Sequence, residues 1–203
     1  MGVRFAQSTD VAEWANASND RCYLRRPQQM RKQDVSEEIE RAIADDDWEA
    51  ARQLIKAALE KEPDSHWLLS RLALTHYEQR DYVRALEIDK QALAIEPACP
   101  LSLWGYAGTL EMLDRPQDAL AVFERITERG LDSLAYDQCG EGRARARGLY
   151  ADCLYRISHC YLALGNRDKA TELLKAHLQQ RGPGCQSIYP ISTVRDEMRR
   201  LGC

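Results

Sequence analysis

From residue 34 onward, the hydrophobic pattern has the period of α-helices. Apolar residues recur three and four positions apart, β-branched runs are few, and Gly or Pro interrupts the pattern every ~15 to 20 residues. This spacing predicts helical hairpins joined by short turns, and therefore an all-α fold. A last helical pattern over 191–202 places Ile191, Val194 and Met198 on one side.

Two segments of this pattern repeat at an offset of 34 residues. Both "DWEAARQLIKAALEKEP" (47–63) and "DYVRALEIDKQALAIEP" (81–97) begin with Asp and an aromatic, and both end in Glu-Pro. A further step of 34 reaches residue 115, so that Ala51, Ala85 and Ala119 form one ladder. Each alanine lies near the start of a second helix, where a small side chain lets two helices approach closely. We expect a larger side chain there to cost about 1 to 3 kcal/mol.

These segments resemble the tetratricopeptide repeat family, whose unit is a helix-turn-helix of 34 residues. The match is clearest in the first half of the fourth unit, "LYRISHCYLALGNRDKA", which places Leu154, Gly165 and Ala170 on the family's positions. The resemblance divides the chain into a basic N-terminal arm, four units, an insertion and a C-terminal capping helix. The ranges are 1–31 for the arm, 32–65, 66–99, 100–133 and 151–184 for the units, 134–150 for the insertion and 185–203 for the cap. The implied architecture is a right-handed α-solenoid.

Capping signals predict where some of these helices begin. Asp34 with Glu37 has the pattern of a capping box at the start of the first helix, and Asp46 with Glu49 has the same pattern at its partner. Asn166 is a favourable N-cap residue for the second helix of the fourth unit.

The insertion, "LAYDQCGEGRARARGLY", has glycines and arginines that suggest an anion-binding loop. A dinucleotide fingerprint beginning at Gly140 requires Gly where Arg145 stands, and the Gly-Lys-Ser/Thr of a phosphate loop is missing. We therefore predict a loop over 137–142, followed by a helix that lengthens the first helix of the fourth unit. On this extension Arg143 and Arg147 share a face. They are either solvated surface residues or a basic lip that selects ligands with acidic flanks.

The family resemblance also implies a binding groove, because the first helix of each unit lines its concave face. The residues carried over to that face include Trp67, Ser70, Leu74 and Tyr77 in the second unit, Trp104 and Glu111 in the third, and Asp152, Tyr155 and His159 in the fourth. Exposed aromatic residues of this kind dominate binding energy at protein interfaces. Two other readings stay open: the aromatic side chains cover the core between repeats, or the chain's own tail covers them.

Composition narrows the class of partner and the compartment. The net charge is −4 with acids and bases interspersed, so we expect no nucleic-acid partner. The seven cysteines contain no C-x-x-C pair, which argues against a disulfide framework and a zinc site and favours a cytoplasmic setting. No segment has the length and apolarity of a membrane span.

Catalytic chemistry is not indicated. His159 and Cys160 are adjacent on a predicted helix and point about 100° apart, so neither can activate the other. We expect no enzyme activity, metal or cofactor. The predicted function is a scaffold or adaptor that binds a peptide or helical segment of a partner in an aromatic groove. The alternatives are a self-associating module that forms a homo-oligomer, a regulatory subunit of a larger complex, and a client binder similar to secretion chaperones.

Overall fold

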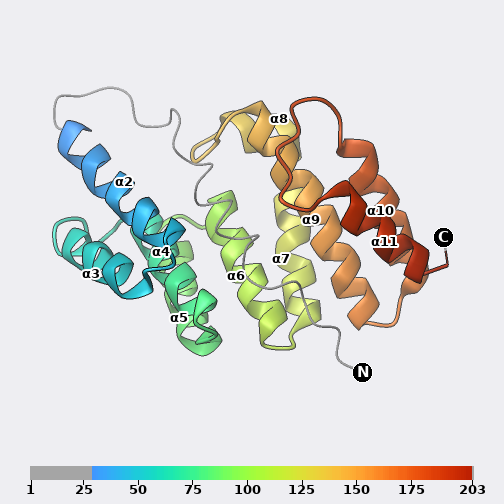
Figure 1. Ribbon diagram of the computed structural model, residues 1–203, viewed down its shortest axis with the longest axis horizontal. Coiled ribbons are helices and arrows are strands. Elements are labelled where there is room, and N and C mark those ends of the chain that lie inside the picture. The colour runs from blue at the N-terminus through green and yellow to red at the C-terminus, as the bar shows by residue number, and fades with distance from the viewer. Residues whose placement is uncertain (1–28, 203) are drawn as a thin grey trace. The chain divides into compact units, whose positions relative to one another are not determined.

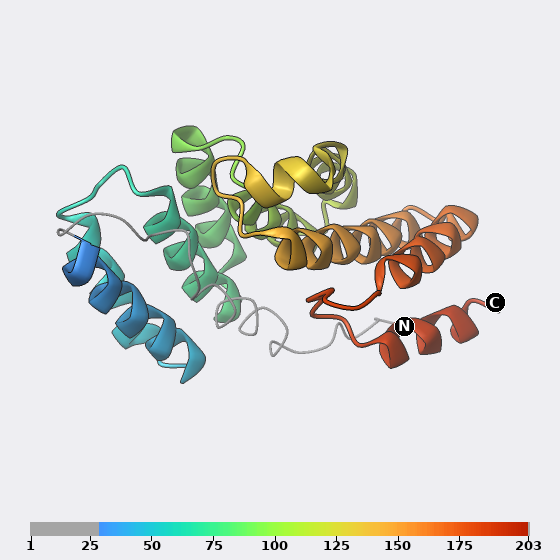
Figure 2. The same cartoon turned by 90° about the horizontal axis from the view of Figure 1, so that it is seen from above.

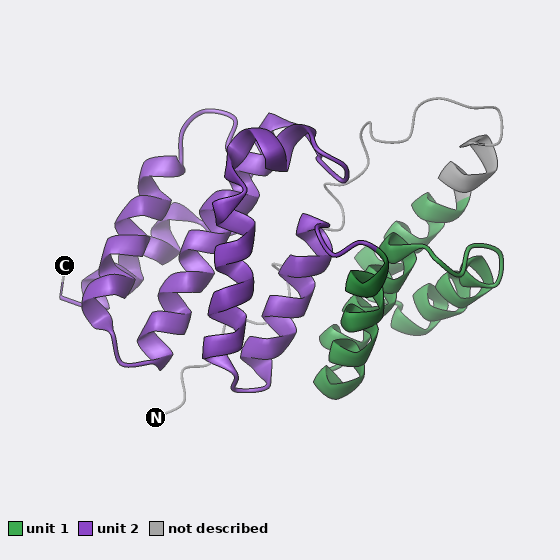
Figure 3. Cartoon of the chain, turned by 180° about the vertical axis from the view of Figure 1, so that it is seen from behind, with its two compact units in different colours: residues 1–95 green, residues 96–203 purple. Residues whose placement is uncertain are grey.

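The computed structural model describes residues 29–202 and divides the chain into two compact units, 1–95 and 96–203 (Figure 3). Every regular element within the described range is a helix (Figure 1). Unit 1 contains α2 (Gln29–Ala44), α3 (Trp48–Leu59), α4 (His66–Glu78) and α5 (Tyr82–Ile95). Unit 2 contains α6 (Pro100–Met112), α7 (Pro116–Glu128), α8 (Gly130–Tyr136), α9 (Arg143–Ala163), α10 (Arg167–Gln180) and α11 (Ile191–Arg200). The predicted all-α fold of paired helices is confirmed, whereas the basic arm lies almost wholly outside the described residues.

The turn inside each helix pair repeats one backbone geometry. Its left-handed residues are Asp46, Arg80, Asp114 and Gly165, with φ of 57°, 63°, 56° and 80°. The next residue donates its N–H to the carbonyl five positions back; these pairs are Asp47 to Ala42, Asp81 to His76, Arg115 to Leu110 and Asn166 to Tyr161, at 2.8 to 3.0 Å. This 6→1 bond closes the end of the first helix. The turns therefore recur with the same spacing as the alanine ladder.

The alanine ladder is buried, as the sequence predicts. Ala51, Ala85 and Ala119 have no exposed surface, and neither does Ala170, the equivalent residue in the last helix pair. Each is the fourth residue of the second helix of its pair. The absence of side-chain atoms beyond Cβ therefore permits the close approach of the two helices.

Two of the predicted helix starts are wrong. Helix α2 begins at Gln29, so Asp34 and Glu37 lie inside it rather than at its start. An acid pair three residues apart also occurs in helix interiors, where it occupies one face. In the next turn Asp46 takes the left-handed position, and Asp47 becomes the N-cap of α3, accepting from the backbone N–H of Ala50 at 3.0 Å. The predicted cap at Asn166 is confirmed, since its side chain accepts from Lys169 N.

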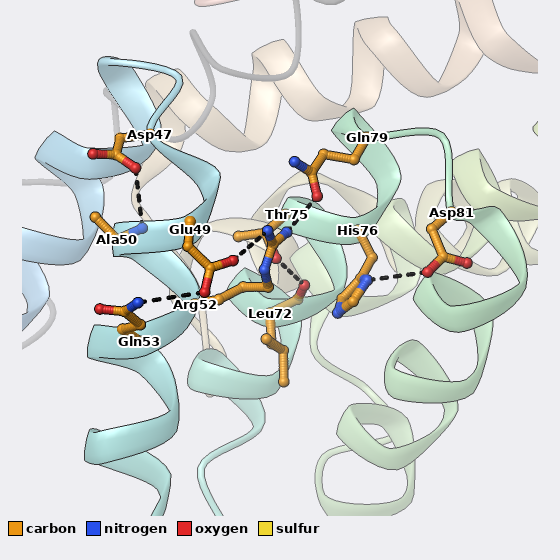
Figure 4. Close-up of polar contacts among 10 residues, drawn as sticks. All are labelled: Asp47, Glu49, Ala50, Arg52, Gln53, Leu72, Thr75, His76, Gln79 and Asp81. Atoms are coloured by element: carbon orange, nitrogen blue, oxygen red, sulfur yellow. Dashed lines mark hydrogen bonds and ion pairs between the residues drawn. The ribbon is translucent and has the colours of Figure 1, made fainter.

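Polar contacts tie α3 to the end of α4 in unit 1 (Figure 4). Arg52 donates to Gln79 Oε1 at 2.5 Å and forms an ion pair with Glu49 at 2.9 Å. Nearby, His76 Nδ1 lies 3.4 Å from a carboxylate oxygen of Asp81, which is the residue after the left-handed turn position. Unit 1 also has an apolar core in which Ile39, Ile43 and Ile55 have no exposed surface.

The insertion in unit 2 folds as a short helix and a loop. The loop over 137–142 and the start of the long helix α9 at Arg143 agree with the sequence-based prediction. Helix α8 was not predicted; it packs on α9, and its Leu134 and Ala135 are buried. Gly140 is needed for packing, because a Cβ there would lie 2.6 Å from the backbone carbonyl of Ala135. The Gly-Glu-Gly stretch therefore has a structural explanation.

Candidate binding face on α9

In unit 2, the C-terminal segment lies against one face of α9. We use "C-terminal segment" for residues 181–202, which comprise an irregular stretch followed by α11, and "α9 face" for Asp152, Tyr155, Arg156 and His159. Figure 2 shows this segment turning back after α10 and placing α11 beside the α9–α10 pair. Because α9 is the first helix of the last pair, this is the surface on which the sequence predicts a ligand.

The irregular stretch is held by a buried carboxylate. Asp152 has no exposed surface, and its two oxygens accept hydrogen bonds from the Ser187 hydroxyl and from the backbone N–H of Ile188, the latter at 3.1 Å. Charge-assisted hydrogen bonds of this kind are about twice as strong as neutral ones. One turn before Asp152, a Cβ on Gly148 would lie 2.0 Å from the Gln186 carbonyl oxygen. Glycine at 148 therefore permits the segment's backbone to touch the helix.

Aromatic stacking continues the contact. The Tyr189 ring stacks on Tyr155 with ring centroids 4.0 Å apart, and both residues are buried. Arg156 donates to the Tyr189 hydroxyl at 3.1 Å. Burial raises the pKa of Tyr189 even though the Arg156 charge opposes this, so the hydroxyl stays protonated at neutral pH.

Helix α11 adds a carboxylate. Glu197 accepts from the Tyr155 hydroxyl at 2.6 Å through one oxygen, and its other oxygen lies 3.1 Å from His159 Nε2. Burial opposes ionisation of Glu197, but the hydrogen bonds and the charge of His159 together lower the pKa of the carboxyl. Val194 is the fully buried residue of α11.

Arg156 also pairs with Glu111 on α6, with Nε and Oε2 2.6 Å apart, and its guanidinium lies over Trp104 at 5.6 Å. Unit 1 contains a similar ion pair: Arg71 on α4 lies 2.6 Å from Glu40 on α2, and its guanidinium lies 5.2 Å from the ring of Trp67 on its own helix. Both arginines are the sixth residue of their predicted unit. Each therefore links the first helices of two successive pairs.

Two other ionisable groups, one buried and one half-buried, lie on the helices α10 and α4. His177 on α10 is fully buried; its Nδ1 lies 2.7 Å from the Ala151 carbonyl, so Nδ1 donates and Nε2 has no partner among the described residues. Burial lowers the pKa of His177, although the Ala151 hydrogen bond opposes this shift. In unit 1, burial together with the charge of Asp46 raises the pKa of Glu78 to about 7.

Comparison with known proteins agrees with this repeat geometry. Residues 76–138 match the family model described as tetratricopeptide repeat. These residues carry the tetratricopeptide repeat pattern. Two crystal structures of MamA share the fold at 18% sequence identity and a TM-score of 0.56. The first match covers 83% of this chain and 86% of that one, and the second 80% and 89%. No curated protein matches the sequence.

In unit 1 of this repeat protein, the predicted groove residues lie on α4 and are half-buried: Trp67, Ser70, Leu74 and Tyr77. Trp67 and Leu74 pack against the core of the first helix pair. Tyr77 makes an edge-to-face contact with Tyr82 of α5, with ring centroids 5.5 Å apart. Part of each side chain remains at the surface of α4.

In unit 2, the prediction of open groove aromatics is wrong. Trp104 is 6% exposed because it packs edge-to-face on Phe123 of α7, with centroids 5.4 Å apart. Tyr155 is equally buried because the C-terminal segment covers it. Glu111 and His159 are engaged by Arg156 and Glu197, respectively. Trp104 therefore packs into the core of its own helix pair, whereas Tyr155 is covered by the chain's own C-terminal segment.

The remaining predicted site residues are the arginines at the start of α9. Arg143 and Arg147 are exposed. Arg143 lies 3.2 Å from an Asp132 oxygen of α8, and Arg147 donates to the Pro183 carbonyl at 3.3 Å. Sequence reasoning missed Arg156, Tyr189 and Glu197 as members of the site. A glycine within the helix-forming run after Arg143, namely Gly148, was the available signal of a close backbone contact.

The thiols of α9 are poorly suited to nucleophilic chemistry. Cys153 and Cys160 are buried, and burial raises the pKa of both, so both stay protonated at neutral pH. His159 faces Glu197 of the C-terminal segment. Within the described range, no helix is both long enough and apolar enough to span a lipid bilayer.

Proposed function

We propose that the protein is an interaction scaffold that binds a peptide or helical segment of a partner protein on the faces formed by the first helices of its repeats. The observation that carries this proposal is the C-terminal segment on α9: an extended stretch and a short helix occupy this face through a buried carboxylate, an aromatic stack and a second carboxylate. The face therefore has the chemistry needed to hold a polypeptide. We propose no catalytic role and a cytoplasmic setting.

The equivalent surface in unit 1 is the face of α4. It carries Arg71 paired with Glu40 and a half-buried aromatic, Trp67, as α9 carries Arg156 and Tyr155. Ser70 and Tyr77 lie one and three turns further along the same helix. Repeat proteins bind extended ligands across several equivalent helices. We therefore propose that Trp67, Ser70, Leu74 and Tyr77 contact the partner.

Site-specific photo-crosslinking in the protein's own cells tests this proposal. A photoreactive amino acid replaces Ser70 or Tyr77 on α4, and the matched control replaces Val83 on α5, which is 63% exposed. We expect a discrete crosslinked partner from positions 70 and 77 and none from position 83. Equal crosslinking at all three positions, or none at 70 and 77, contradicts a partner-binding α4 face.

Size-exclusion chromatography with light scattering, run on the same protein, addresses self-association. A mass that corresponds to one chain at the crosslinking concentration excludes an obligate homo-oligomer. If the crosslinked product is a second copy of this chain, the self-associating module becomes the better assignment.

A further inference from the structure

The contacts between the C-terminal segment and α9 resemble those of a bound ligand more than those of a core helix. Several of them are polar: the Asp152, Arg156 and His159 side chains each meet a polar group of the segment. Val194 is the fully buried member of α11, whereas Ile191, Met198 and Leu201 are half-buried. Interfaces that are more polar than a domain core are typical of contacts that form and break.

The connection to α10 permits movement of the segment. Gly182, Pro183 and Gly184 are exposed, and Gly184 has φ of 78°. A Cβ on Gly184 would meet nothing within 4 Å, so no neighbouring residue packs against this position. Helix α11 has 10 residues, which is below the length at which an isolated helix is stable in water. The segment therefore depends on α9 and α10 for its order, while α10 is anchored by its own buried residues, including Ala170 and Leu174.

Departure of the segment does not leave an unpaired charge in an apolar interior. The polar groups that the segment covers, Asp152, Arg156 and His159, line the face that the segment vacates, and water can solvate them there. The cost of opening is then the loss of one aromatic stack, a few hydrogen bonds and the burial of Val194. Sub-global opening of this kind has a smaller free energy than unfolding of the whole unit.

We propose that the C-terminal segment is a displaceable intramolecular ligand of the α9 face and that a partner segment of the same chemistry takes its place. The chemistry follows from the face. For Asp152, the partner segment must supply a hydroxyl and a backbone N–H from an extended stretch. For Tyr155 and Arg156, it must supply a tyrosine two residues after that hydroxyl. For His159, it must supply a carboxylate from a helix that follows. This inference rests on the proposed scaffold function and states which kind of partner segment unit 2 binds.

A labelled peptide that copies residues 183–202, with Ser in place of Cys185, is the probe. It is titrated by fluorescence anisotropy into the full chain and into an opened full chain carrying Tyr189→Ala and Glu197→Ala. These changes remove the stack and the carboxylate from the protein's own segment and leave the α9 face intact. We expect the opened chain to bind the peptide at least ~10-fold more tightly than the wild type, since an aromatic stack and a charge-assisted hydrogen bond together exceed 1.4 kcal/mol.

A matched variant tests the site of binding. Gly148→Ala in the opened chain places a methyl group where the Gln186 carbonyl of the bound segment lies, and it improves the helix propensity of α9. We expect this change to abolish peptide binding without loss of helical content by circular dichroism. Undiminished binding to the Gly148→Ala chain shows that the peptide binds elsewhere and overturns the assignment.

Hydrogen exchange of the unmodified full chain provides a measurement that depends on no variant. We expect the amides of Ile188 and of α11 to exchange at least ~10-fold faster than those of α9 and α10. If α11 exchanges only as slowly as α9, or if a folded opened chain binds the peptide no better than the wild type, the segment is a fixed part of unit 2 and the inference fails. The α4 crosslinks decide the scaffold function separately, because that experiment does not involve α9.

Discussion

Replacing Arg80 by glycine should stabilise unit 1, because the turn between α4 and α5 holds this arginine at φ 63°. A left-handed conformation costs a residue with a Cβ roughly 1 to 2 kcal/mol. Glycine removes that cost but adds roughly 0.5 to 1 kcal/mol of backbone entropy in the unfolded chain. The Arg80 side chain is exposed, so its loss removes little packing. The expected net gain for Arg80→Gly is about 0.5 to 1 kcal/mol.

The fourth repeat supplies the reverse experiment. Gly165 occupies the equivalent turn with φ of 80°, and a Cβ there would meet nothing within 4 Å. Gly165→Ala therefore isolates the backbone term without a steric clash, and we expect a loss of about 1 kcal/mol. The two substitutions should act with opposite signs because the repeat places both residues in one conformation.

Urea denaturation followed by circular dichroism measures both effects as shifts of the midpoint at unchanged slope. Val83→Ala, at an exposed position of α5, is a control that should change stability by less than about 0.5 kcal/mol. A destabilising Arg80→Gly or a neutral Gly165→Ala would refute the argument that the turn geometry is shared across the repeats.

Further predictions concern buried groups and the arginines of α9. The folded-state pKa of His177 is lowered, so its contribution to stability is present above its ordinary pKa of 6.5 and is lost as the pH falls from 6.5 through the lower folded-state pKa; pH-dependent unfolding of wild type and His177→Gln measures it. The folded-state pKa of Glu78 is raised to about 7, so stability should fall as the pH rises from 4.5 to 7. This fall should total about 1 to 2 kcal/mol after allowance for partial exposure, and Glu78→Gln should abolish it. Ala119→Val should cost about 1 to 3 kcal/mol in thermal unfolding, whereas the same change at the exposed Ala144 should cost less than about 0.5 kcal/mol. If the basic lip binds acidic flanks, Arg147→Glu should weaken partner binding a few-fold and flatten its salt dependence, and an unchanged salt dependence argues for a solvated surface role.

Local signals predicted the repeat framework. The buried ladder of Ala51, Ala85 and Ala119 follows from spacing alone, because a small residue is required wherever two helices of a pair approach closely. The loop over 137–142 could be predicted because glycine and helix-forming residues influence the backbone only within a few positions along the chain. Capping signals were less specific. The pattern at Asp34 lies inside a helix. Asp46 takes the left-handed conformation of the turn, so the N-cap is the next residue, Asp47.

The amino-acid sequence thus determined the helix pairs, their period and the small residues between them, since each depends on neighbours in the same repeat. Tertiary structure decided which groove residues are open. Trp104 is buried by a ring of the next helix, and Tyr155 by a tyrosine of the C-terminal segment. The contact of Asp152 with Ile188 joins residues 36 positions apart, and that of Tyr155 with Glu197 joins residues 42 apart. No local pattern specifies such pairs, because they form only when the chain after α10 turns back onto α9.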